Sequence, residues 1–547
     1  MKKFFNRIAV CAVLCTIALS GCEKFLTTNP STEVPDTDAI ATVAQLEKVL
    51  TSAYKQLLFN TSGGENADRI FAGVPGLQMY WDERGQDIMS HENMGGYQVS
   101  SYSFSPSFTR EDGNANYMWN FGYALINQCN IIIDALPDAT GDESDKVLID
   151  GQCKAMRAIA YFHLIQTYQQ TYAIAKDKRG VILRTSTSDP TNLGFSTVEQ
   201  VYTQILKDFG EAKTELANYK RDAVWKVDVD VINGWLARVY QVMGNNWSEC
   251  YNCAKAVYDT HSTLMTKEQW YSGFDDCIQN NIPEVVWAMS YTTENNLGGG
   301  TQFNFWHNQD PATFGEGQKG IYHFFDFFVT PEYVALFDEG DWRGAKIPDG
   351  TTFETPEELE EAELQVMFWK RQFAGSDDWK TKWCYNKYKH YGDDTYQTRP
   401  DVCLMRGTEM LLVMAEALAN QDKYAEAVTL LNKLQASRGA KLTTTTQKQA
   451  LLEEIYVERR KELLCEGVTG QFDLVRLQKD LFRKGTTSDN PAGHYVYGVN
   501  QFDGYTAANP QGTLPSNDYR WFFQIPQAEF SYNTAISYSD QNPFSGK

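Results

Sequence analysis

Apolar residues recur at helical spacing along much of the chain, and this pattern predicts a mainly α-helical protein. The clearest helix follows Ser196 and Glu199, which have the spacing of a capping box. An earlier apolar stripe runs from Ile149 to Leu164. The stripe after the capping box consists of Val198, Val201, Ile205, Phe209, Ala212 and Leu216.

Further helices are predicted downstream of this stripe. Asp228 or Asp230 can cap a helix that ends at Gly244, and the next helix begins at Trp247. Near the C-terminus, short turns such as residues 420–422 indicate antiparallel helix hairpins. The late helices are expected over residues 405–419, 424–437, 447–466 and 471–482.

These hairpins carry aromatic and alanine positions similar to those of tetratricopeptide-type units, in which each unit covers the apolar face of its neighbour. The chain has no clean period of about 34 residues, so a stacked helical superhelix is expected without regular repeats. The helical frame is predicted from about residues 39–57, 115–172, 195–259 and 401–484.

Long stretches between the helices are rich in Gly, Asn, Asp, Thr and aromatic residues. Long irregular segments in a compact protein are usually functional or disordered, and their aromatic content argues against disorder. Large irregular loops are therefore expected to form a ligand-binding lobe on the helical frame. This lobe is predicted from about residues 60–118, 260–400 and 485–525.

The N-terminus has the pattern of a lipoprotein signal peptide. A basic start is followed by an apolar run over residues 8–19, which is too short for a permanent membrane helix, and then by Leu19-Ser20-Gly21-Cys22. Cleavage before Cys22 would leave residues 1–21 as the signal and residues 22–547 as the mature chain, with acyl chains on Cys22 as its only membrane attachment. The alternative is an ordinary signal peptide with a chance cysteine. The length fits roughly three to four domain-sized units or one large repeat-built domain.

Charge and cysteine usage narrow the possible partners. The formal net charge of −21 argues against nucleic acid and anionic membrane surfaces. Eight cysteines follow Cys22, an even number that permits disulfides, but no pairing can be assigned from the sequence. For Cys153 and Cys403, which fall on predicted apolar helix faces, a buried free thiol is expected.

One charged block on a late predicted helix invites a catalytic interpretation. Residues 458–462 alternate in charge, and side chains three or four residues apart on a helix form modestly stabilising ion pairs. A structural role is therefore expected, and a reactive charged relay is the alternative. No metal site, cofactor or catalytic group is predicted. A calcium site at residues 112–116 is the alternative, since they supply oxygen ligands but lack the glycine and distal glutamate of a calcium loop.

Several sequence blocks resemble the SusD/RagB family, and they occur in the family's order along nearly the whole mature chain. The strongest is Glu458–Leu463 continuing into Phe472–Arg476. The other blocks are Cys22–Pro30, Phe195–Tyr202, Gly234–Tyr240, Arg406–Leu412, Ile525–Glu529 and Gln541–Pro543.

This resemblance implies a surface-exposed outer-membrane lipoprotein that captures nutrient and works with a TonB-dependent transporter of the SusC type. Family members bind oligosaccharides or polysaccharides, the RagB-like branch binds peptides, and none of them is an enzyme. A glycoside hydrolase is the alternative from another class, and it would need two acids held across a cleft.

The aromatic content supports a glycan ligand, because sugar sites combine aromatic platforms with polar hydrogen-bonding groups. Aromatic residues make up 13% of the chain, including 13 Trp and 30 Tyr. Packing of these side chains against the frame is the alternative for each of them. The predicted ligand-binding residues are Tyr80, Trp81, Glu83 and Arg84 in one loop, Asn304, Trp306 and Tyr322 in a second, and Trp369 in a third.

Overall fold

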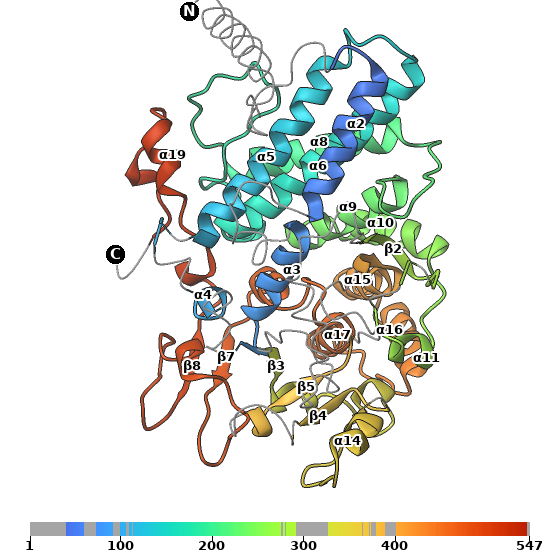
Figure 1. Cartoon of the computed structure of the whole chain (residues 1–547), viewed down its shortest axis with the longest axis vertical. Helices are drawn as coiled ribbons and strands as arrows, with labels where there is room; N and C mark the ends of the chain where they lie inside the picture. The colour runs from blue at the N-terminus through green and yellow to red at the C-terminus, as the bar shows by residue number, and fades with distance from the viewer. Residues whose placement is uncertain are drawn as a thin grey trace, which may run out of the picture.

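Long antiparallel helices form one half of the molecule in the computed structural model, and shorter helices with small sheets form the other (Figure 1). The first half contains α2 (Val43–Leu58), α5 (Gly113–Ala135), α6 (Glu143–Tyr168), α8 (Val198–Glu215), α9 (Val229–Met243) and α10 (Trp247–Thr260). The structure describes residues 40–58, 73–90, 99–104, 109–111, 113–274, 277–278, 280–290, 327–363, 365–370, 372, 379–388 and 401–543.

The second half is built around helices of the C-terminal part. It contains α15 (Gly407–Asn420), α16 (Tyr424–Arg438), α17 (Lys448–Leu463) and α18 (Gln471–Arg476). Helix α15 packs against α10, so it joins the two halves. The remaining helices are α3 (Gly73–Glu83), α4 (Val99–Tyr102), α7 (Tyr172–Ala175), α11 (Lys267–Tyr271), α13 (Pro331–Val334), α14 (Pro356–Glu363) and α19 (Gln527–Tyr532).

Short antiparallel strands order much of the region predicted to be irregular. One four-stranded sheet has the order β1-β3-β5-β4, and two pairs of strands, β2-β6 and β7-β8, lie outside it. The ligand-binding lobe that the sequence predicted is therefore less irregular than expected. The strands are β1 (Ile88–Ser90), β2 (Val285–Ser290), β3 (Phe327–Val329), β4 (Phe368–Lys370), β5 (Trp383–Tyr385), β6 (Asp401–Arg406), β7 (Leu481–Lys484) and β8 (Gln511–Leu514).

The helix starts follow the predicted local chemistry, with one shift. Asp228 caps α9 by accepting a hydrogen bond from the Val231 amide, and Gly244 ends the helix with φ of 66°. The capping box of α8 lies one residue later than predicted, because Thr197 and Gln200 form it in place of Ser196 and Glu199. The predicted apolar stripe of α8 is buried.

Two late helices were predicted with wrong boundaries. The apolar run before Gly407 is strand β6, which is buried at every position and pairs with β2. A fully buried strand has the same continuous apolar pattern as a buried helix segment. Helix α18 ends at Arg476, and residues 481–484 form β7, whose side chains alternate between buried and exposed.

The charged block on α17 contains a predicted pair within the helix, Lys461 with Glu458 at 3.0 Å, but it is buried and also pairs with other elements of the fold. Glu462 accepts hydrogen bonds from Arg343 at 2.8 Å and from Arg438 at 3.0 Å, and it also pairs with Arg406. Burial alone would raise the pKa of Glu462, but the guanidinium groups of Arg438, Arg406 and Arg343 lower it well below its usual value. These pairs join α17 to α16, β6 and the segment before α14.

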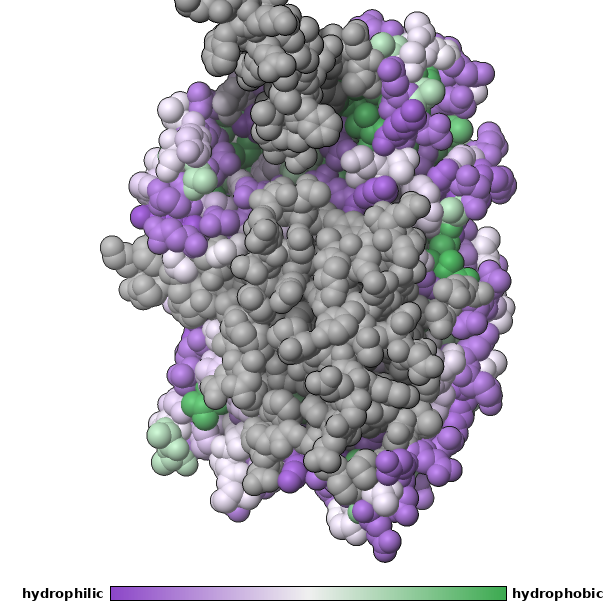
Figure 2. Space-filling view, viewed as in Figure 1, coloured by the Kyte–Doolittle hydropathy of each residue, from purple (hydrophilic) through white to green (hydrophobic). Residues whose placement is uncertain are grey.

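The eight cysteines after Cys22 are buried free thiols. Cys153 lies on α6 as predicted, whereas Cys403 lies on β6 and not on a helix. No helix in the described part of the chain is both long and apolar enough to cross a membrane. Hydrophilic residues dominate the described surface seen in Figure 2, with small apolar patches among them.

Candidate functional site

The first predicted ligand cluster lies inside the protein. Tyr80, Trp81 and Glu83 belong to helix α3, and Arg84 follows it directly. Trp81 is 6% exposed, and its ring stacks on the His163 ring with centroids 5.2 Å apart and planes 12° apart. The predicted exposed loop is therefore wrong here, because α3 runs through the core and its aromatic faces are covered by protein.

The polar members of this cluster are also held by neighbouring structure. Arg84 donates hydrogen bonds to the carbonyl oxygens of Arg520 and Trp521 at 2.7 and 3.0 Å, and its guanidinium lies 4.1 Å from the Phe104 ring centroid. Burial raises the pKa of the Glu83 carboxyl well above its usual value, although the charge of Arg483 opposes the shift. Arg84 therefore anchors the C-terminal segment to α3.

The third predicted position, Trp369, is likewise a packing residue. It lies on β4, is 1% exposed, and donates a hydrogen bond from Nε1 to Oδ1 of Asn386 at 3.0 Å. Its predicted exposure is wrong. The second cluster, Asn304, Trp306 and Tyr322, lies outside the described residues, as does Cys22.

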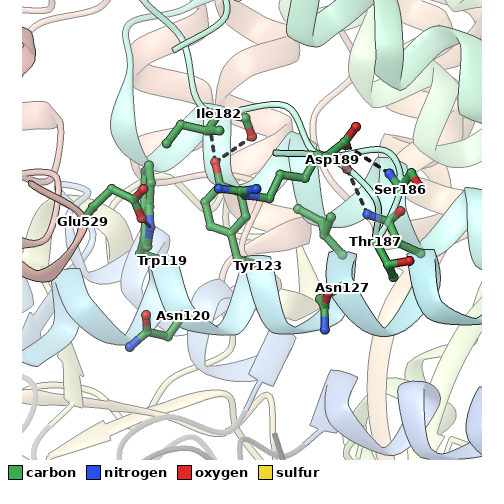
Figure 3. Close-up of a pocket in the computed structure, with 12 residues that line it drawn as sticks. Trp119, Asn120, Tyr123, Asn127, Ile182, Ser186, Thr187, Asp189 and Glu529 are labelled. Carbon is green, nitrogen blue, oxygen red and sulfur yellow. Dashed lines mark hydrogen bonds between the residues drawn. The ribbon is translucent and has the colours of Figure 1, made fainter. Parts of the chain in front are cut away.

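A cavity of about 290 Å³ opens beside α5, and we name it the α5 pocket. Its size is close to the lower end of small-ligand sites, which span ~300–1,000 Å³. The pocket combines aromatic, amide, hydroxyl and charged side chains (Figure 3). Its lining residues are Trp119, Asn120, Tyr123, Ile126, Asn127, Asn130, Ile182, Arg184, Ser186, Thr187, Asp189 and Glu529.

Two aromatic side chains of α5 are fixed by distant segments. The indole Nε1 of Trp119 donates a hydrogen bond to Glu529 Oε2 at 3.1 Å, which brings α19 to the pocket. The Tyr123 hydroxyl donates to the Ile182 carbonyl at 2.8 Å and accepts from the Ile182 amide at 2.9 Å. Both pairs can be followed in Figure 3. The two rings lie one helical turn apart, with centroids 4.8 Å apart.

The loop that closes the pocket is held by its own polar groups. Asp189 Oδ2 accepts hydrogen bonds from the Thr185 and Ser186 amides at 2.6 and 3.1 Å. Buried Asn130 donates to the Arg184 carbonyl at 3.1 Å. A loop fixed in this way presents its remaining polar groups without paying much conformational entropy on binding.

Two amides on the pocket rim are free to bind a ligand. Asn120 and Asn127 are exposed, and their side chains make no hydrogen bond to any residue that the structure describes. Each amide can donate two hydrogen bonds and accept two. Trp119 is 3% exposed, so the half-buried ring of Tyr123 is the aromatic surface that, with these amides, matches the mixed apolar and hydroxylated surface of a sugar.

A second cavity, which we name the C-terminal groove, lies beside the end of the chain. It has a volume of about 520 Å³ and lies between residues 169–179, 517–522 and 539–543. Arg179 donates hydrogen bonds there to the Gly180 carbonyl at 2.7 Å and to Asn542 Oδ1. Lys178 and Asn517 are exposed, and Tyr519 is half-buried. The groove therefore offers cations, amides and an aromatic ring together.

Sequence patterns did not point to either cavity. Trp119 and Tyr123 lie on a predicted helix, at a spacing that equally fits core packing. Their functional signal is the combination with unpaired Asn120 and Asn127 on the same helix. This combination becomes recognisable only once α5 is known to face residues 182–189 and α19.

Two family models match the chain. One, described as SusD family, matches residues 336–544, and the other, described as starch-binding associating with outer membrane, matches residues 24–241. The SusD-like protein P38 of Formosa agariphila is 24% identical over 513 residues, covering 88% of this chain and 93% of that protein.

Solved structures share the fold. A SusD-like carbohydrate binding protein from Bacteroides vulgatus has a TM-score of 0.73 and 24% identity, with 92% of this chain and 99% of that chain covered. A SusD superfamily protein from Bacteroides thetaiotaomicron has a TM-score of 0.67 and 22% identity, with coverages of 92% and 100%. The predicted mainly helical fold with this architecture is confirmed.

Proposed function

The chain belongs to the SusD/RagB family, and from this premise we propose that it captures oligo- or polysaccharide at the cell surface. SusD proteins are a non-catalytic binding family, so the protein is not an enzyme. In this proposal it delivers the captured glycan to a TonB-dependent outer-membrane transporter of the SusC type.

The observation that carries the glycan proposal is the α5 pocket. The half-buried ring of Tyr123 lines this pocket with the free amides of Asn120 and Asn127, and buried Trp119 packs against that ring. Aromatic surface accommodates the apolar C–H face of a sugar, and amides bond its hydroxyls. Extended peptides are more often held by backbone hydrogen bonds along a sheet edge, which this pocket lacks among its lining residues.

The printed names of similar proteins agree with this ligand class. One matching family model is described as starch-binding, and the Bacteroides vulgatus structure is described as carbohydrate binding. We extend the binding of a carbohydrate, without a particular polysaccharide, to this chain.

The predicted loop residues remain part of the proposal. Asn304, Trp306 and Tyr322 combine an amide with aromatic rings, as the α5 pocket does. A polysaccharide is longer than one pocket, so recognition at two places on the surface is compatible with a single ligand. Trp306→Ala should weaken binding by about 2 kcal/mol or more if the ring is a stacking platform.

The proposed cellular location of the protein rests on its N-terminal sequence and on the description of one matching family model. One matching family model is described as associating with the outer membrane. We propose that Cys22 becomes the acylated first residue after removal of residues 1–21, and that residues 22–547 form one domain outside the membrane.

The proposal is tested by calorimetry on the chain lacking residues 1–21, titrated with a panel of neutral and acidic oligosaccharides. Asn127→Ala should weaken binding of the cognate glycan by about 1 kcal/mol, because one exposed hydrogen-bonding group is removed. Asn218→Ala is the matched control, since Asn218 is an exposed amide that lines neither cavity. Equal affinity of both variants and wild type would move the site away from the α5 pocket. Binding of peptides without any saccharide would favour a RagB-like function.

A further inference from the structure

A short basic segment links the two cavities. Residues 176–184 contain Lys176, Lys178, Arg179 and Arg184 but a single acid, Asp177, in a chain whose net charge is −21. Lys178 and Arg179 line the C-terminal groove, and Arg184 lines the α5 pocket. The positive charge of this segment is therefore concentrated where ligands could enter.

The cations that line the cavities are not neutralised by protein carboxylates. Within the described chain, Lys178, Arg179 and Arg184 form no ion pair within 4 Å. Arg184 donates to the carbonyl oxygens of Pro190 and Thr191 at 2.9 and 2.6 Å, and Arg179 likewise bonds neutral oxygens. Asp540 also lines the groove but is not within ion-pair distance of either cation.

Buried guanidinium groups of this fold have two kinds of partner. Arg157 and Arg238 each meet a carboxylate at 2.7 Å, whereas fully buried Arg483 bonds only backbone carbonyl oxygens among the described residues. Arg179 resembles the second kind, since it is half-buried and its hydrogen bonds go to neutral oxygens. Burial lowers its pKa to about 10, although the charge of Asp540 opposes the shift.

Neutral groups that suit a sugar lie beside these cations. Asn517 is exposed, Tyr519 is half-buried, and neither side chain bonds to a residue in the part of the chain that the structure describes. The ammonium group of Lys178 is exposed and likewise bonds to no residue that the structure describes. A carboxylate or sulfate group would pair with the cation, while the amide and phenol would contact hydroxyls of the same ligand.

We propose that the C-terminal groove binds an acidic unit, bearing a carboxylate or a sulfate ester, of the captured saccharide. This inference rests on the proposed glycan-binding function and narrows its ligand class. Arg184 lines the α5 pocket together with the carboxylates of Asp189 and Glu529, so the acidic unit is assigned to the C-terminal groove alone.

The test compares Lys178→Gln with Lys176→Gln. Both changes remove one exposed positive charge from the same segment, but Lys176 lines neither cavity. Neither ammonium group pairs with a carboxylate in the described chain, so both variants should keep the wild-type melting temperature. The probes are oligogalacturonate, a sulfated galactan oligosaccharide, and a neutral galactose oligosaccharide of the same length.

Lys178→Gln should weaken binding of one acidic probe about three- to tenfold, as expected for loss of roughly 1 kcal/mol of charge-assisted bonding. Lys176→Gln should leave that affinity unchanged. Raising the salt concentration should reduce the difference between wild type and Lys178→Gln, because partly exposed charges are screened. The acidic probe that responds identifies carboxylate or sulfate as the recognised group.

Two outcomes would overturn the inference, and they differ from failure of the proposed function. If wild type binds the neutral probe at least as tightly as both acidic probes, the groove is not an acidic subsite although glycan binding stands. If Lys178→Gln and Lys176→Gln bind an acidic probe equally well, that probe binds elsewhere. Failure of every saccharide to bind wild type would overturn the glycan proposal itself.

Discussion

Protonation of His163 should destabilise the fold below neutral pH, and this tests whether Trp81 lies in the core. His163 is 5% exposed, lies between the rings of Trp81 and Trp235, and donates from Nδ1 to the Ile159 carbonyl at 2.9 Å. Burial, with a smaller contribution from the charge of Arg238, lowers its pKa from 6.5 to about 3.

The direction in which stability changes with pH follows from proton uptake by the folded and unfolded chains. Between pH 6.5 and 3 the unfolded chain binds a proton at His163 and the folded chain does not, so the free energy of unfolding falls as pH falls. Each pKa unit corresponds to ~1.4 kcal/mol. From pH 6.5 to 4.5, His163 should therefore cost the wild type roughly 2–3 kcal/mol of stability.

His163→Asn isolates this contribution, because the amide can still donate to Ile159 but cannot become charged. Loss of the ring stack costs the variant about 0.5–1.5 kcal/mol at every pH. Urea unfolding followed by circular dichroism at several pH values gives both free energies, and carboxylate titrations cancel in their difference. The excess of the wild-type free energy of unfolding over that of His163→Asn should shrink or reverse by pH 4.5. Parallel curves would mean that His163 is solvated and that the covered position of Trp81 is wrong.

Four further outcomes are expected. Leu463→Ala should cost ~2–5 kcal/mol in urea unfolding, because the side chain is fully buried, and an unchanged midpoint would refute its place in the core. Glu462→Gln should lower the free energy of unfolding by ~3–5 kcal/mol at pH 7, because its cationic partners lose their counter-charge. Since the pKa of Glu462 is lowered in the folded state, this loss should persist at pH 5 and vanish only in strong acid. A loss that has already disappeared at pH 5 would contradict this ion-pair role. Tyr123→Phe should melt lower by a shift equivalent to about 1–3 kcal/mol, since the Ile182 amide and carbonyl lose their partner, whereas unchanged melting would exclude that pair. Cys22→Ala should release the protein from membranes, and retention after carbonate extraction would disprove lipid attachment.

The helical frame could be predicted because its signals are local. The stripe of α8, the Asp228 cap and the Gly244 terminus each depend on residues within a few turns of one another. The errors arose where tertiary pairing decides the conformation. Strand β6 is extended because β2 lies beside it, and the apolar sequence before Gly407 cannot distinguish that strand from a buried helix.

The site was harder to predict because its contacts are remote in sequence. Trp119 and Glu529 are 410 residues apart, and Tyr123 and Ile182 are 59 apart. The composition of residues 80–84 correctly indicated aromatic and charged groups close together. It could not reveal that these groups bind the protein itself, since a core that buries charges and a sugar site use the same residue types.

Calorimetric titration of the chain lacking residues 1–21 with oligosaccharides measures directly whether the protein binds glycan. A glycan-capturing protein should bind at least one saccharide class with saturation and a defined stoichiometry. Asn127→Ala should weaken this binding and Asn218→Ala should not, and no reducing ends should be released during prolonged incubation. Saturable binding of peptides with no response to any saccharide, or the release of reducing ends by the purified protein, would contradict this glycan-binding role.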